Sequence, residues 1–107
     1  MMFTTSRIES FSERLIEFVA KVASGIKYDK AKLALITGPT LLQLVIDVIN
    51  AVSTAVSLRS PNGLLYCGLC RKGPFTKRGM YLHLIRIHRY ELKTLIMSEL
   101  EEHIKKL

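Results

Sequence analysis

The stretch YCGLCRKGPFTKRGMYLHLIRIH, Tyr66 to His88, holds both cysteines of the chain and two of its three histidines. It contains a C-x2-C pair, twelve intervening residues and an H-x4-H pair, and the four side chains concerned are Cys67, Cys70, His83 and His88. Zinc takes four tetrahedral ligands from thiolates and imidazoles, and a two-residue gap lets both sulfurs converge from one tight turn. The spacing therefore predicts one structural zinc ion held by these four side chains.

The alternative is a redox-active or reduced cysteine pair with unrelated surface histidines, because a C-x-x-C pair alone is a weak signal. The complete and correctly ordered ligand set favours the metal. Histidines five residues apart point about 140° away from each other on an ideal helix. We therefore expect an irregular helical turn around Ile85 to Ile87.

This stretch resembles the two-cysteine, two-histidine (C2H2) zinc-finger family, and single fingers in short proteins of thermophilic archaea and their viruses are similar. The resemblance implies a small ββα unit, in which a hairpin carries the cysteines and a helix carries the histidines. The aromatic core position of such fingers falls on Pro74, with Phe75 beside it, and the leucine position falls on Met80.

Apolar residues recur at helical spacing on both sides of the motif. Ser6 and Glu9 form a capping-box pattern, and the apolar repeat after them predicts a helix from about Ser6 to Ser24. The segment Ala31 to Thr37 fits either a helical turn or a short strand, and we favour the helix. The segment Leu41 to Leu58 predicts an apolar helix with one polar stripe, which must be covered by other parts of a helical bundle or by a second copy.

The turn-rich sequence from Arg59 to Gly63 predicts the one boundary in the chain. We expect a mainly α protein with a helical, oligomerising unit over residues 1–59 and one ββα finger over residues 64–90. The finger helix is then expected to lead into a C-terminal helix over residues 91–107, where apolar residues again recur at helical spacing.

The net charge of +7 is concentrated around the motif, since residues 58–93 contain eight Lys and Arg against one acidic residue. This distribution predicts a surface for a polyanion, and a merely solvating basic face is the alternative. Zinc fingers place helix positions −1, 3 and 6 against DNA bases, which here are Thr76, Gly79 and Leu82, with Arg78 between them. Phosphate contacts are expected from Arg71, Lys72, Lys77, Arg86, Arg89 and Lys93.

These features predict a small DNA-binding transcriptional regulator of modest sequence specificity, acting as an oligomer, with a dimer through the N-terminal helices favoured. RNA is a second candidate ligand. The alternative function is a protein-interaction or assembly module in which the finger is a structural staple. We expect no enzymatic activity, because four protein ligands leave zinc no open position.

Location and source are predicted from weaker signals. Asp47 near the centre of the most apolar segment argues against membrane insertion. No secretory signal is readable, which predicts an intracellular protein of the cytoplasm or nucleoid. A single Gln and two Asn residues hint at a thermophilic source.

Overall fold

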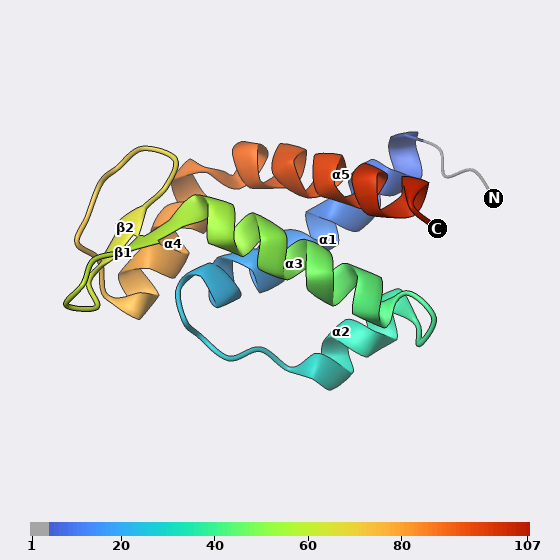
Figure 1. Ribbon diagram of the computed structural model, residues 1–107, viewed down its shortest axis with the longest axis horizontal. Coiled ribbons are helices and arrows are strands. Elements are labelled where there is room, and N and C mark those ends of the chain that lie inside the picture. Colours follow the sequence, from blue (N-terminus) through green and yellow to red (C-terminus); the bar gives the residue numbers. More distant parts are fainter. Residues whose placement is uncertain (1–4) are drawn as a thin grey trace.

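The computed structural model describes residues 5–107, with side chains described from residue 7 onward. The described chain forms five helices and one two-stranded antiparallel sheet. In order, they are α1 (Thr5–Ala23), α2 (Lys30–Thr37), α3 (Leu42–Val56), β1 (Ser57–Arg59), β2 (Leu65–Cys67), α4 (Lys77–Ile87) and α5 (Arg89–Lys105). Figure 1 shows the sheet and α4 at one end of an elongated molecule, and the start of α1 and the C-terminus at the other. The mainly helical architecture expected from the sequence is confirmed.

Helices α1, α3 and α5 pack against one another along the length of the molecule (Figure 1). Each helix turns an apolar face inward, as the spacing of its apolar residues predicts. The core contains, among others, the fully buried side chains Leu15, Val19, Val48, Ile49, Ile96 and Leu100. The predicted capping box at the start of α1 depends on the side chain of Ser6, which lies outside the described residues.

The predicted apolar helix is α3, and its polar stripe faces outward. Gln43, Asp47, Asn50 and Thr54 are exposed, whereas Val45, Val48, Ile49 and Val52 are buried. The apolar side of α3 is therefore covered largely within the same chain, by α1 and α5. No single helix in residues 5–107 is long and apolar enough to cross a membrane; α2 and α3 meet that test only as a pair, and they are bent by 117°.

The ambiguous segment before α3 is helical, as favoured. Asp29 caps α2, because its side chain accepts hydrogen bonds from the backbone N–H groups of Ala31 (2.9 Å) and Lys32 (3.3 Å). A short strand would leave these donors without the cap. Buried Leu33 anchors α2 to the core.

The prediction for Leu41 to Leu58 is wrong at its C-terminal end, where Ser57 and Leu58 belong to β1. Strand β1 pairs with β2 in the register Ser57 with Cys67, Leu58 with Tyr66 and Arg59 with Leu65. The predicted turn is the loop of this hairpin, closed by hydrogen bonds between Ser60 and Leu64 and between Gly63 and Ser60. Pairing with β2 thus overrides the local helical pattern.

The metal-binding stretch and the N-terminal helices share one hydrophobic core, which includes Leu65, Met80 and Leu84 together with residues of α1 and α3. Helix α4 packs against α1 and β2. At the end of α1, a Cβ on Gly25 would lie 3.5 Å from Lys77 Cε and 3.6 Å from Arg59 Nη2. These two cations lie near the carbonyl end of α1, where positive charge is favourable.

Candidate metal centre

Four side chains from four successive parts of the fold converge at the sheet end of the molecule. Cys67 ends β2, Cys70 lies in the turn that follows, His83 lies within α4, and His88 separates α4 from α5. One potential ligand atom from each lies within 4.8 Å of all the others. The structure therefore brings together all four residues that the sequence predicted, close enough to bind a metal ion.

The turn that carries the cysteines is held by backbone hydrogen bonds. The N–H of Arg71 donates to the carbonyl of Cys67 (2.9 Å), and the N–H of Cys67 donates to the carbonyl of Lys72 (2.9 Å). The N–H of Leu69 also points at the Cys67 sulfur, at 3.4 Å. These bonds fold residues 67–72 tightly enough to direct both sulfurs to one point.

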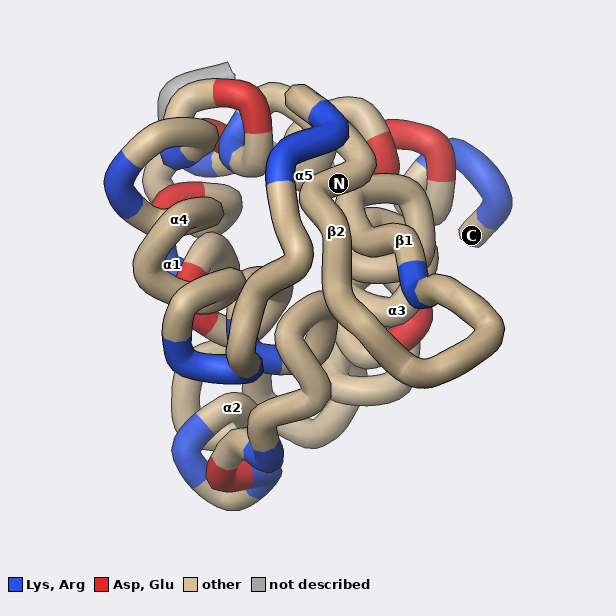
Figure 2. The backbone as a smooth tube through the Cα atoms, turned by 90° about the vertical axis from the view of Figure 1, so that its left-hand side faces the viewer, with Lys and Arg blue, Asp and Glu red and all other residues tan. Residues whose placement is uncertain are grey.

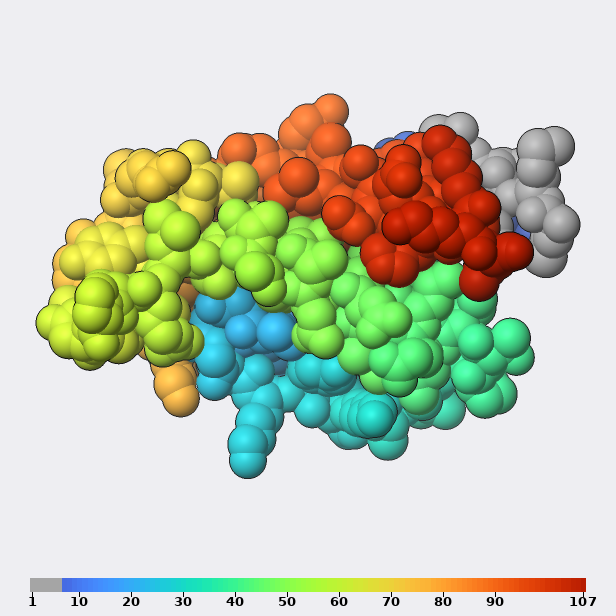
Figure 3. All heavy atoms as spheres, viewed as in Figure 1, coloured from blue at the N-terminus to red at the C-terminus, as the bar shows by residue number. Residues whose placement is uncertain are grey.

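Gly68 seats this turn directly on the end of α3. Its N–H donates to the carbonyl of Val56 (2.8 Å), and a Cβ at this position would lie 2.8 Å from the carbonyl oxygen of Ala55. Only glycine permits so close a backbone approach. Figure 3 shows the hairpin and the turn lying against α3 as one continuous surface.

His83 is held within a regular part of α4. Its ring stacks on Phe75 with the centroids 4.7 Å apart, and its Nε2 lies 3.3 Å from the Cys70 sulfur. Burial is the largest cause that lowers the pKa of His83, and the neighbouring His88 adds to it. The neutral imidazole, which is the form that binds metal, is thereby favoured.

His88 lies at a break in the helix, with φ −116° and ψ 22°. Helix α4 remains regular through Ile87, and α5 begins at Arg89. The irregularity predicted from the histidine spacing is thus present, but at His88 and not at Ile85 to Ile87. The break lets the second imidazole turn toward the first, and the two ring centroids lie 4.9 Å apart.

The two ring nitrogens of His88 have different surroundings. Its Nδ1 lies 2.6 Å from Oε1 of Glu91, whereas Nε2 is buried and has no hydrogen-bond partner among the described residues. Burial lowers the pKa of His88, but the hydrogen bond with Glu91 and the negative charge on nearby Cys70 outweigh it and raise the pKa overall.

The pKa values of the two thiols shift in opposite directions. Burial is the main cause that raises the pKa of the Cys67 thiol. A backbone hydrogen bond from Lys72 is the largest cause that lowers the pKa of the Cys70 thiol, and the nearby side chain of His88 adds to it. The thiolate of Cys70 is thus favoured by the backbone of Lys72.

These residues fit a metal ion. Two sulfurs and two imidazole nitrogens are the ligand set of a tetrahedral site. A bound cation would give the buried Nε2 of His88 the partner that residues 5–107 do not supply.

The surrounding strands differ from the expected ββα arrangement. The strand that ends at Cys67 pairs fully with β1, which lies upstream of the motif, and touches the segment after the cysteines only through a bridge between Leu65 and Phe75. His88 lies beyond α4, so this helix carries one ligand where two were expected. The expected small core is present in part, since Met80 is fully buried and Phe75 is half-buried against His83.

The predicted nucleic-acid contacts fall into two groups. Five cations are exposed on the sheet end of the molecule or along α4: Arg71, Lys72, Lys77, Arg78 and Arg86. Figure 2 looks onto this end and shows basic segments in the loop after β2 and at the start of α4.

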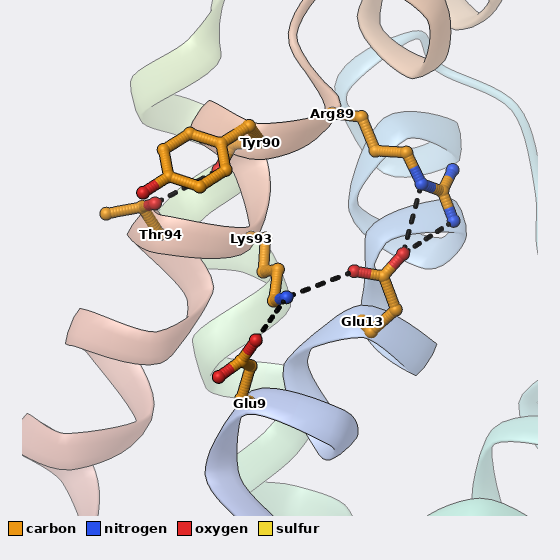
Figure 4. A network of polar contacts seen from close by, with 6 residues as sticks. All are labelled: Glu9, Glu13, Arg89, Tyr90, Lys93 and Thr94. Carbon is orange, nitrogen blue, oxygen red and sulfur yellow. Dashed lines mark hydrogen bonds and ion pairs between the residues drawn. The ribbon is translucent and has the colours of Figure 1, made fainter. Parts of the chain in front are cut away.

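Arg89 and Lys93 are instead engaged with α1. Arg89 makes two 3.1 Å contacts with Glu13, and Lys93 lies 2.9 Å from Glu9 and 3.7 Å from Glu13 (Figure 4). These ion pairs offset the charge of both cations.

The polar residue predicted at the start of the finger helix also has a structural role. Thr76 caps α4, with its hydroxyl accepting a hydrogen bond from the N–H of Gly79 (3.0 Å). Gly79 has no side chain to offer, and Leu82 is half-buried. The helix positions that would meet bases therefore present little hydrogen-bonding capacity.

Two residues near the site were missed at the sequence level. Glu91 follows His88 by three residues, a helical spacing that could have indicated the contact. Arg59 adds a further exposed cation near Lys77, but only the fold brings the two together.

No known protein family has a sequence model that matches this chain, and comparison with curated proteins and with solved structures likewise finds no match.

Proposed function

We propose that this chain is a zinc-stabilised DNA-binding protein that holds the DNA backbone with the basic surface beside its metal centre. One observation carries the proposal. Five exposed cations lie in the same stretch of chain as the four potential metal ligands, and the sequence has no Asp or Glu between Asp47 and Glu91. Such a surface attracts a polyanion and releases its counterions on binding.

The ligand set supports zinc as the metal, because mixed thiolate and imidazole ligands in a four-residue site are typical of structural zinc. Four protein ligands leave no open position for a substrate or a water molecule, so we assign the ion a structural role. Its binding would fix the turn after β2, α4 and the start of α5 relative to one another.

Sequence specificity is expected to be modest. Phosphate contacts set affinity and register, whereas base contacts specify sequence. The hydroxyl of Thr76 already caps the helix and Gly79 lacks a side chain, so Arg78 is the principal candidate for a base contact. A transcriptional role would then depend on avidity, which an oligomer supplies without new contacts.

The test is a titration of labelled duplex DNA with the zinc-loaded protein, followed by fluorescence anisotropy between about 50 and 200 mM salt. We expect a steep fall in affinity with salt and similar affinities for unrelated sequences. The double variant K77A/R78A should reduce the salt slope by about two. A single-stranded RNA and an RNA duplex serve as competing ligands.

The matched control is K105A/K106A, which removes the same amount of charge at the C-terminal end of α5, where both lysines are exposed. It should leave the slope nearly unchanged. An equal decrease of the salt slope in the two double variants would show that only the net charge of the protein matters, which would contradict the assigned surface. Absence of DNA binding at the lowest salt concentration would refute the proposal. Tighter binding to RNA than to DNA would show that RNA is the ligand of the basic surface.

The alternative, an assembly module, is favoured by one observation: Ile87 and Tyr90 flank the metal ligand His88 and are 64% and 79% exposed. The predicted dimer through the N-terminal helices remains a prediction, although their apolar faces largely pack against other helices of the same chain. Light scattering on I87S/Y90S and on the unaltered protein distinguishes these ideas. A dimer lost in the variant places the interface at the metal end.

A further inference from the structure

The imidazole of His88 is held from the side opposite the metal-ligand cluster. Its Nδ1 lies 2.6 Å from Oε1 of Glu91, a residue of the first turn of α5. The side chain of His88 is 6% exposed, and that of Glu91 is 52% exposed. The carboxylate thus reaches from the solvent side to a buried ring.

This contact selects one tautomer of the neutral ring. A carboxylate only accepts hydrogen bonds, so the proton of a neutral imidazole must be on Nδ1. The lone pair is then on Nε2, the atom that is buried and has no hydrogen-bond partner in the described part of the chain. A carboxylate behind a histidine in this way orients the ring and strengthens it as a metal ligand.

We propose that Glu91 is a positioning residue of the metal centre, which sets the tautomer and the orientation of His88. This inference depends on the proposed metal site and adds a residue outside the four ligands. Glu91 holds the outer nitrogen of His88, while the inner nitrogen is left for the ion.

The imidazole rings of the two histidines are held in place by different contacts. His83 lies inside a regular helix, and its ring is held by stacking on Phe75. His88 lies at the helix break, where its backbone N–H donates to the carbonyl of Leu84 (3.1 Å) and its carbonyl accepts from the N–H of Leu92 (2.9 Å). Among the described residues no ring stacks face to face on its imidazole, and the hydrogen bond with Glu91 orients the ring instead.

Helix α5 presents Glu91 from a fixed base. On either side of it, Arg89 pairs with Glu13 and Lys93 pairs with Glu9, both on α1. Glu91 itself has no such partner on α1 among the described contacts and is directed to His88. The position of α5 on the bundle is thereby linked to the orientation of a metal ligand.

The test compares the zinc and cobalt affinities of the full-length protein with those of E91Q and E91A, measured by competition with a chromophoric chelator. We expect E91A to bind zinc about 10-fold to 100-fold more weakly. E91Q should lose less, because its amide oxygen can still accept the hydrogen bond but carries no charge. The cobalt absorption spectrum and the nitrogen chemical shifts of His88 report whether the ring still ligates through Nε2.

E99Q is the matched control, since Glu99 lies near His103 on the same helix (3.6 Å) and the change in charge is the same. The metal-free forms of E91Q and E99Q should unfold at similar temperatures, which separates a role in ligation from a role in folding. Affinity of E91A equal to that of E99Q would overturn the role of Glu91. Failure of the unaltered protein to bind either metal would overturn the metal site itself.

Discussion

The ammonium group of Lys93 lies 2.9 Å from Oε1 of Glu9 and so joins two residues that are 84 positions apart in the chain. With the neighbouring pair of Arg89 and Glu13, it ties the start of α5 to α1 (Figure 4). Both pairs lie at the surface, where ion pairs contribute little individually and are screened by salt. Their value lies in fixing how the last helix lies on the first.

We expect K93M to lower the melting temperature slightly at low ionic strength, with the difference vanishing at about 1 M salt, where the screening length is about 3 Å. Thermal unfolding followed by circular dichroism measures this. The double variant K93M/E9Q should be no less stable than K93M alone, because the interaction is already lost. A further loss of similar size in the double variant would contradict the pairing.

The same pair has a defined pH dependence. The hydrogen bond with Glu9 raises the pKa of Lys93 above its ordinary value of 10.5. A cation with a raised pKa in the folded state contributes stability fully below its ordinary pKa, and this contribution is lost as the pH rises through the folded-state value. The difference in denaturant midpoint between the unaltered protein and K93M should therefore be constant from neutral pH to about 10 and shrink above 10.5. A difference that grows above pH 10.5 would contradict this assignment.

Leu84 is the test of whether α4 is part of the common core. It is fully buried in the cluster shared with α1 and α3, whereas Ile87 on the same helix is 64% exposed. L84A should lower the free energy of unfolding by about 2–5 kcal/mol, and I87A by no more than about 0.5 kcal/mol. Chemical denaturation of the zinc-loaded proteins measures both. Equal effects of the two changes would show that α4 is not packed as described.

Metal removal should act unevenly along the chain. Residues 64–88 carry the four potential metal ligands, whereas α1 and α3 share a large apolar interface of their own. With a chelator, hydrogen exchange should accelerate over residues 64–88 and in the first turn of α5, while α1 and α3 stay protected. Protection that is unchanged over residues 64–88, with the metal shown to be gone, would contradict a folding role for the ion.

The G68A variant tests the seating of the cysteine turn on α3. The added Cβ would lie 2.8 Å from the backbone oxygen of Ala55, which cannot move aside as a side chain can. We expect lower stability and weaker metal binding, measured by thermal unfolding and chelator competition. G63N is the control, because nothing lies within 4 Å of a Cβ there and asparagine tolerates a positive φ. Unchanged metal affinity in G68A would show that the turn does not need this contact.

The sequence indicated the elements whose causes are local. The four residues that lie close enough to bind a metal ion were identifiable from their spacing, and α1, α3 and α5 from their apolar repeats. The strand at Ser57 and Leu58 was not identifiable, because these residues continue the polar and apolar pattern of a helix and become a strand only through pairing with residues 65–67. The N-terminal unit and the metal-binding stretch appeared separable for the same reason.

Charged residues were the other source of error. Arg89 and Lys93 belong to a basic stretch in the sequence, and nothing local distinguishes them from Lys77 and Arg78. Only the packing of α5 on α1 brings acidic residues opposite Arg89 and Lys93. The role inferred for Glu91 likewise required the helix break at His88, which moves the imidazole toward the next helix.

Helix α3 passes into β1 at Val56 and Ser57 without an intervening residue, and the hairpin then leads directly to Cys67. A flexible linker would let the metal-binding stretch rotate relative to the helical bundle. The direct connection from α3 through the hairpin to Cys67 does not allow this rotation. If the basic end binds DNA as proposed, the helical body is therefore expected to approach the DNA in one orientation. If two copies bind side by side on one DNA, the shape of each rigid copy then sets the distance and the angle between them.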